Sequence, residues 1–234
     1  MIRPLAVTCS DLPAGLMAIP VRTALVRAGD DLVALVSQAV QSIARSSDVI
    51  AVSETAVAIA QGELVGAEFV RPSRLAYALA RRAGALATVN QPESLQLVID
   101  RAGTPKVIYA AVMHVLGRVR GRRGVFYEIM GESMTAIDGY TGTMPPYERA
   151  IVLSPREPET FANAVSERTG VACAVVDAND LHAAKVLGAS PGVDCQNVER
   201  ALLGNPHGNS DEQTPIVILK WRGPGANPLF EGIA

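Results

Sequence analysis

Carboxylates occur in this sequence at places that could bind a divalent cation. They lie in a Gly- and Pro-rich segment, after a short apolar segment, and before the last apolar segment: Asp138, Asp177, Asp180, Asp211 and Glu212. Mg²⁺ and Mn²⁺ prefer carboxylate oxygens held at rigid strand ends, where the ion can also bind nucleotide phosphates. These acids can form a metal site if folding brings them together. The alternative is that each acid caps a helix, as Asp177 or Asp180 could do before a helix over 181–187.

Basic residues concentrate in a second segment. They are Arg118, Arg120, Arg122 and Arg123, with Lys106 upstream. Residues 106–116 and 123–130 are rich in Val, Ile, Tyr and Phe, which predicts two strands joined by a basic turn that contains glycine. Alternate arginines on one face of that hairpin would form an anion site. A solvated hairpin tip is the other interpretation.

Several common catalytic motifs are absent. The sequence has no GxxxxGKS/T segment, no GxGxxG after a strand and no serine within GxSxG. The histidines have no cysteine or second histidine at metal-ligand spacing, which argues against a zinc site. His114 falls in an apolar pattern and is expected in the core, whereas Lys185 and Lys220 are expected to face solvent.

The candidate residues would be positioned by alternating strands and helices. Apolar segments predict strands over 19–28, 48–53, 149–154, 172–176 and 214–221, and helical spacing predicts helices over 32–43, 73–82, 92–101, 157–168, 180–187 and 194–203. Ser53 and Glu54 follow a buried strand, at the end where α/β proteins bind ligands. Because strands and helices alternate irregularly, we expect an α+β fold, that is, a mixed α/β arrangement.

The composition excludes several classes of protein. The 234 residues include 21 Lys+Arg and 23 Asp+Glu, and the formal net charge of −2 argues against a nucleic-acid-binding protein. Mean hydropathy is +0.22. Residues 32–44 are nevertheless the longest segment without a charged side chain, which is shorter than the roughly 20 residues of a membrane-spanning helix. Three cysteines without CxxC spacing, and no secretory signal pattern, indicate reduced thiols in the cytoplasm.

The sequence predicts one main domain and a short tail. We expect residues 1–222 to form a single domain, which could consist of two intertwined subdomains. Residues 223–234 are expected to form an irregular C-terminal arm, because Gly and Pro are frequent at its start. Trp221 and Phe230 could supply an apolar contact for assembly.

Taken in order, several segments resemble the coenzyme F420-0:gamma-glutamyl ligase family. They are 26–32 (VRAGDDL), 46–53 (SSDVIAVS), 71–73 (RPS), 122–124 (RRG), 136–138 (AID), 151–158 (IVLSPREP), 174–177 (AVVD) and 208–215 (GNSDEQTP). The first is similar to the start of that family's first helix, and the second is similar to the strand that follows. The similarity covers about residues 19–219.

This resemblance implies a fold, a reaction and a set of site residues. The fold is the F420 ligase-like one, with mixed sheets flanked by helices. The reaction uses GTP and Mg²⁺ or Mn²⁺ to join a small-molecule carboxylate substrate to an amino acid through an acyl phosphate. The resemblance places the metal at Asp138, Asp177, Asp180 and Glu212, and the nucleotide or substrate at Ser53, Arg118, Arg120, Arg123 and Asn209. It also implies a homodimer, and it leaves the catalytic residues unassigned.

The sequence departs from the family pattern at charged positions. Glu54 stands where the family has a lysine after the strand, and Asn209 stands where it has a glutamate. The alternative function is therefore a binding or regulatory homologue that keeps an anion or metabolite site and does not ligate.

Overall fold

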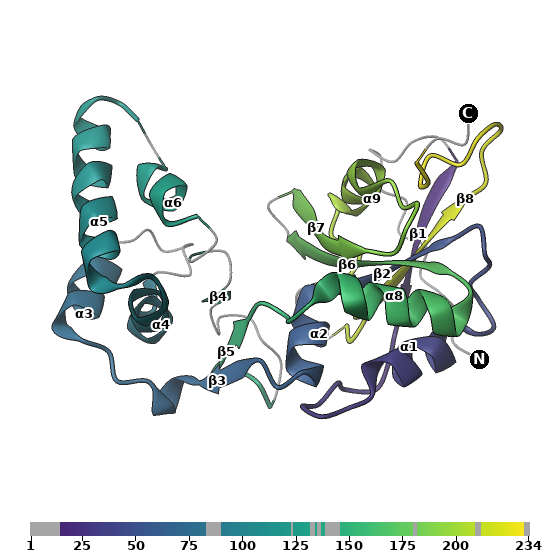
Figure 1. The fold of residues 1–234 in the computed structure, drawn as a ribbon, viewed down its shortest axis with the longest axis horizontal. Coiled ribbons are helices and arrows are strands. Elements are labelled where there is room, and N and C mark those ends of the chain that lie inside the picture. Colours follow the sequence, from purple (N-terminus) through teal and green to yellow (C-terminus); the bar gives the residue numbers. More distant parts are fainter. Residues whose placement is uncertain are drawn as a thin grey trace. The chain divides into compact units, whose positions relative to one another are not determined.

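The chain divides into two compact units in the computed structural model (Figure 1). The structure describes residues 15–82, 90–122, 124–131, 134, 137–138, 146–179, 182–208 and 212–231. The first unit comprises Met1–Glu63 and Pro155–Ala234, and the second comprises Leu64–Ser154. The chain therefore leaves the first unit once, builds the second, and returns.

A five-stranded mixed sheet forms the centre of the first unit. Its strands are β1 (Leu16–Val21), β2 (Val49–Ser53), β6 (Ala172–Asn179), β7 (Ala183–Ala189) and β8 (Ile216–Trp221), in the order β1-β8-β2-β6-β7. β2 and β6 are parallel, and the other neighbours are antiparallel. The ends of β1, β2 and β6 therefore share one edge with the beginnings of β7 and β8. Val and Ala dominate β2 and β6 because helices cover both faces of these central strands.

Helices lie on both sides of this sheet. They are α1 (Leu32–Val40), α2 (Glu54–Ala60), α8 (Pro158–Thr169) and α9 (Cys195–Leu202). Figure 1 shows α9 on one face and the other three on the opposite face. Aspartates cap two of these helices: Asp31 accepts from the Ala34 amide and Asp194 from the Asn197 amide.

The residues after β8 fold back onto the first unit. Leu229 is fully buried, and Trp221 and Phe230 pack against the apolar cluster between the sheet and α9. Phe230 also forms a β-bridge with Val193, and the Leu229 carbonyl accepts from the Asp194 amide. The apolar residues that the sequence suggested for assembly therefore serve the core of their own unit.

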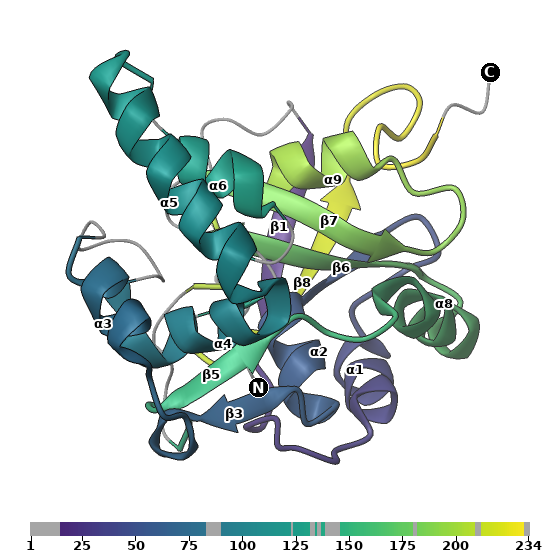
Figure 2. The ribbon, with the colours of Figure 1, turned by 60° about the vertical axis from the view of Figure 1, so that its left-hand side comes forward.

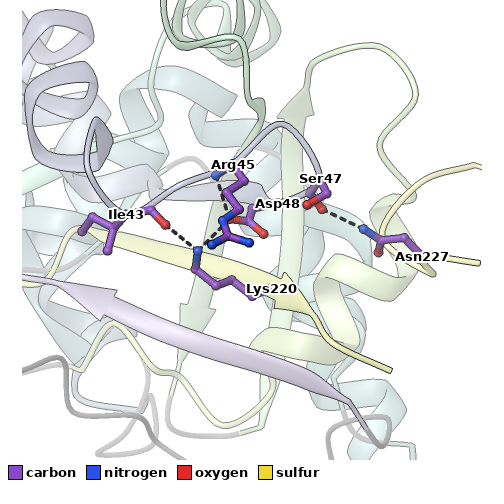
Figure 3. A network of polar contacts seen from close by, with 6 residues as sticks. All are labelled: Ile43, Arg45, Ser47, Asp48, Lys220 and Asn227. Carbon is purple, nitrogen blue, oxygen red and sulfur yellow. Dashed lines mark hydrogen bonds and ion pairs between the residues drawn. The ribbon is translucent and has the colours of Figure 1, made fainter. Parts of the chain in front are cut away.

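A buried ion pair fixes the loop before β2. Lys220 Nζ donates to Asp48 Oδ2 at 2.9 Å and also to the Ile43 carbonyl, while the Arg45 amide donates to the same Asp48 oxygen at 2.8 Å (Figure 3). The Asn227 side chain donates to the Ser47 carbonyl at 2.7 Å. The prediction that Lys220 faces solvent is wrong, since only 11% of its side chain is exposed.

The second unit combines a small antiparallel sheet with helices. The strands are β3 (Leu64–Gly66), β5 (Ala150–Leu153) and β4 (Ile137–Asp138), in that order across the sheet. The helices are the short 3-10 helix Ala67–Phe69, α3 (Arg74–Ala80), α4 (Pro92–Ala102), α5 (Thr104–Val119) and α6 (Val125–Met130). Figure 2 shows the long α5 with α6 beside it. An apolar cluster that includes Leu95, Val107 and Ile151 holds these elements together.

The predicted α+β class is confirmed, but two segments have the wrong secondary structure in the prediction. Residues 106–116 and 123–130, predicted as strands, belong to the helices α5 and α6. The sequence of α5 resembles that of a strand because the helix carries apolar residues on two opposite faces, and this hides the helical period of the apolar positions. Residues 180–187, predicted as a helix, contain most of β7. Pairing with the extended β6 outweighs the helix preference of this alanine-rich segment. No helix in the described part of the chain is long and apolar enough to cross a membrane.

Candidate active site

One edge of the five-stranded sheet brings together residues from distant segments. Ser53, the last residue of β2, is aligned with Val176 of the parallel strand β6, so Asp177 lies one residue further along. The Ser53 amide donates to the Pro215 carbonyl at 2.8 Å. The Thr23 amide likewise donates to the Gln213 carbonyl at 3.0 Å. The segment that leads into β8 is therefore anchored across the ends of β1 and β2.

Ser53 joins β2 directly to α2. It is the residue before the helix, but its side chain makes no capping hydrogen bond. Glu54 follows as the first helical residue, where the helix dipole favours a negative charge. The hydroxyl of Ser53 thus lies at the sheet edge without being used to cap α2.

Asp177 lies within β6 and faces Lys185 of β7. The interpretation that it caps a following helix is wrong, because β6 continues to Asn179 and the next element is a strand. Asp177 is exposed, yet partial burial raises the pKa of its carboxyl group and the positive charge of Lys185 opposes that increase. A carboxylate in poorly solvating surroundings gains more from a nearby cation than one in bulk water does.

Glu212 and His207 flank residues 209–211 at the same edge. The carboxyl group of Glu212 lies over Gly208, where a Cβ atom would come within 2.7 Å of Glu212 Cδ. His207 is buried, its Nδ1 lies 3.1 Å from the Thr214 carbonyl, and the Thr214 hydroxyl donates to the His207 carbonyl. Burial lowers the pKa of His207 to about 4. The ring is therefore neutral at pH 7, and its Nδ1–H donates to the Thr214 carbonyl. Neither His207 nor Gly208 could be recognised as a site residue from the sequence pattern alone.

The burial of His207 predicts that acid lowers the stability of the folded protein. Because its folded-state pKa is about 4, below its ordinary value, the unfolded chain binds the extra proton first as the pH falls. Stability should therefore be lost as the pH falls through the ordinary value toward 4, amounting to about 2 kcal/mol at about pH 5. Urea unfolding of wild type and His207→Gln at several pH values measures this. The variant should show a shallower pH dependence, and equal slopes would contradict the assignment.

The arginine cluster belongs to the second unit and is not a hairpin. Arg118 lies in the last turn of α5 and Arg120 is the residue that follows the helix. Arg122 forms an exposed ion pair with Glu128, at 3.0 Å. Cations at this end of a helix are favoured by its dipole, which accounts for part of the cluster without a ligand.

The remaining predicted residues are only partly placed. Asp138 lies in β4 of the second unit, where its backbone pairs with Val152. Arg123, Asp180, Asn209 and Asp211 lie outside the described residues. Within the described ranges, no group of three or more His, Cys, Asp or Glu side chains could hold a metal ion. The first unit thus contributes Ser53, Asp177 and Glu212 at one sheet edge, whereas Asp138 and the arginines belong to the second.

Comparison with known families gives one match. The family model described as F420-0:Gamma-glutamyl ligase matches residues 20–207. This span contains Ser53, Asp138 and Asp177, and it ends just before Asn209 and Glu212. No curated protein gives a significant match.

Proposed function

Because this chain belongs to the F420-0:gamma-glutamyl ligase family, we propose that it joins an amino acid to a small-molecule carboxylate substrate with GTP and Mg²⁺ or Mn²⁺. Membership supports a gamma-glutamyl ligase-like function. The observation that most directly supports the finer proposal is the sheet edge at which Ser53 ends β2 and Asp177 lies one residue further along the neighbouring parallel strand β6. Ligands of open α/β sheets bind at the carboxyl ends of such strands.

The proposed reaction has two steps. An oxygen of the substrate carboxylate attacks the γ-phosphorus of GTP, the bond to the β-phosphate oxygen breaks, and GDP leaves. The amine of the amino acid then attacks the acyl carbon, loses a proton and displaces inorganic phosphate, which leaves an amide.

The donor chemistry of the edge suits a hard cation. Asp177 and Glu212 offer carboxylate oxygens, the type of ligand that Mg²⁺ and Mn²⁺ prefer. We assign these two residues to the metal, and the assignment of Asp138 and Asp180 rests on the family resemblance alone. The bound ion would neutralise phosphate charge during transfer.

The other predicted residues are assigned to the nucleotide and the substrate. The Ser53 hydroxyl, at the end of β2, is suited to donate to a phosphate or carboxylate oxygen. Arg118, Arg120 and Arg123 offer the planar donors that bind phosphate or a carboxylate. Asn209 would contribute its side-chain amide to binding of the nucleotide or the substrate.

Glu54 favours a second candidate function. A carboxylate at the first position of α2 adds negative charge directly after Ser53, where phosphate binding would be helped by a base. The chain could therefore be a homologue that binds a metabolite without ligating it.

Nucleotide binding provides the first test. GTP with Mn²⁺, each at saturating concentration, should raise the melting temperature by about 5–10 °C, since a ligand at a hundredfold its Kd stabilises by about 2.7 kcal/mol. ATP and Mn²⁺ alone serve as comparisons. As a control, the variant Glu167→Gln removes an exposed carboxylate on α8 and should show the same increase in melting temperature as wild type.

The same samples separate the two candidate functions. A shift accompanied by release of GDP and phosphate that depends on the amino acid supports the ligase. A shift without turnover supports the binding homologue. No shift with either nucleotide would contradict the proposed use of GTP.

A further inference from the structure

Two hydrogen bonds between His207 and Thr214 join the two ends of the segment that precedes β8. The Nδ1–H of His207 donates to the Thr214 carbonyl at 3.1 Å, since a carbonyl can only accept. In return, the Thr214 hydroxyl donates to the His207 carbonyl. Each residue thus binds the backbone of the other through its side chain, and this pair is the His207–Thr214 clamp.

Backbone hydrogen bonds connect one end of the clamp to the sheet. Thr214 lies between Gln213 and Pro215, and the carbonyls of both neighbours accept from the sheet edge. The Gln213 carbonyl accepts from the Thr23 amide at 3.0 Å, and the Pro215 carbonyl accepts from the Ser53 amide at 2.8 Å. The position of Thr214 is therefore fixed against the ends of β1 and β2, and the clamp extends this fixed position to the other end of the segment.

The imidazole of His207 supplies something that an apolar side chain at this position could not. His207 is buried, and its Nε2 has no hydrogen-bond partner among the described residues. A buried polar atom without a partner costs free energy, so an apolar side chain would be more favourable for packing alone. The contribution of the imidazole is the Nδ1–H donated to the Thr214 carbonyl.

The residue after His207 provides the surface on which the Glu212 carboxyl group lies. A Cβ atom at Gly208 would come within 2.7 Å of Glu212 Cδ and 2.8 Å of Glu212 Oε2, well below the roughly 3.5 Å of a favourable contact between carbon atoms. The absence of a side chain at Gly208 therefore allows the carboxyl group to lie there. Because Gly208 directly follows His207, the clamp also determines where this surface is.

We propose that His207 and Thr214 are positioning residues, which hold the carboxyl group of Glu212 over Gly208 at the sheet edge. The inference rests on the proposed function in that it takes Glu212 as a metal ligand. Glu212 is exposed, and an exposed glutamate loses rotamer freedom when it binds an ion. A carboxylate that is already held in place loses less of this freedom, so it binds the ion more tightly.

Paired substitutions at Thr214 test the clamp in the full chain, with Mn²⁺ alone as the probe. Thr214→Val removes the hydroxyl and keeps the size of the side chain, whereas Thr214→Ser keeps the hydroxyl. Electron paramagnetic resonance of unbound Mn²⁺ measures the Kd. Thr214→Val should weaken Mn²⁺ binding by about 10- to 100-fold, the usual effect of losing a group that orients a metal ligand, and Thr214→Ser should stay within about threefold of wild type.

Thr169→Val is the matched control for Thr214→Val. It also removes a hydroxyl that donates to a backbone carbonyl, that of Val165 at 2.8 Å. Thr169 ends α8 and precedes β6, so it lies at the edge of the sheet opposite to the one that carries Asp177. This variant should keep the wild-type Kd for Mn²⁺ even where its melting temperature is lower. Far-UV circular dichroism checks that all variants fold.

Alanine at Gly208 tests the position of the carboxyl group directly. Gly208→Ala should displace the flexible end of Glu212 and weaken Mn²⁺ binding by about 10- to 100-fold. Gly62→Ala is the control, because Gly62 has a φ of +74°, close to the +73° of Gly208. A Cβ atom at Gly62 would meet nothing within 4 Å in the described part of the chain. Both variants therefore carry the same backbone strain, and only Gly208→Ala should change the Kd.

Proteolysis without metal tests the clamp independently of the proposed function. Glutamyl endopeptidase cleaves after Glu212 once this segment leaves the sheet edge, and mass spectrometry identifies the cleaved bond. Thr214→Val should be cleaved between Glu212 and Gln213 about fivefold faster than wild type, the factor expected for the loss of one hydrogen bond. Thr214→Ser should be cleaved at about the wild-type rate.

The outcomes distinguish failure of the clamp from failure of the proposed function. If wild type does not bind Mn²⁺, the assignment of Glu212 to the metal fails, and faster cleavage of Thr214→Val still supports the clamp. Equal cleavage of Thr214→Val and wild type would overturn the clamp with or without metal binding. A wild type that binds Mn²⁺, with the same Kd in Thr214→Val and Gly208→Ala, would overturn the positioning of Glu212.

Discussion

Replacing Lys220 by methionine is expected to lower the free energy of unfolding by about 3–5 kcal/mol. The variant leaves the carboxylate of Asp48, which is 4% exposed, without its cation, and it removes the donor to the Ile43 carbonyl. The remaining Arg45 amide cannot offset the loss of hydration around a buried charge. Urea unfolding followed by circular dichroism measures the change.

A double variant separates the unpaired charge from lost packing. Asp48→Asn/Lys220→Met should be more stable than Lys220→Met alone, because the amide oxygen can still accept from the Arg45 amide and no charge is left unpaired. The control Arg222→Met changes an exposed cation directly after β8 and should shift the free energy of unfolding by less than about 0.5 kcal/mol. Equal destabilisation by Lys220→Met and Arg222→Met would show that the buried pair does not stabilise the fold.

Much of the first unit could be predicted because the local sequence pattern of each element agrees with the structure that it adopts. The strand before Ser53 and the strand before Asp177 are short apolar segments, and both prove to be central parallel strands. The helices predicted over 32–43 and 194–203 are found as α1 and α9, each with an aspartate that caps its first turn. Local patterns suffice where burial, propensity and capping all favour the same element.

The prediction failed where a tertiary contact or a second apolar face determined the structure. α5 has one apolar face for its own unit and another exposed to solvent, so its composition resembled a strand. Lys220 could not be recognised as buried, since its partner Asp48 is distant in the sequence. The pattern also gave no sign that Asp138 belongs to a different compact unit from Asp177.

Asp177→Asn is expected to separate catalysis from stability. If this carboxylate holds the metal that neutralises phosphate charge, turnover should fall by about 100- to 1,000-fold, comparable with the loss of one preorganised electrostatic contact. GTP hydrolysis that depends on the amino acid measures this, with Glu167→Gln as the matched charge control. Turnover within about twofold of wild type would exclude Asp177 from the metal site.

Stability should change in the opposite direction. Partial burial raises the pKa of Asp177 in the folded protein, so the folded state binds this proton more tightly than the unfolded chain does. The ionised group therefore weakens the fold once the pH rises through that raised pKa, and an uncharged asparagine side chain at this position avoids the effect. Without metal, Asp177→Asn should melt at a higher temperature than wild type at pH 7, and the difference should disappear in acid. Because a purely structural aspartate would lose stability on this substitution, a gain in stability joined to a loss of turnover is the result that identifies a ligand-binding carboxylate.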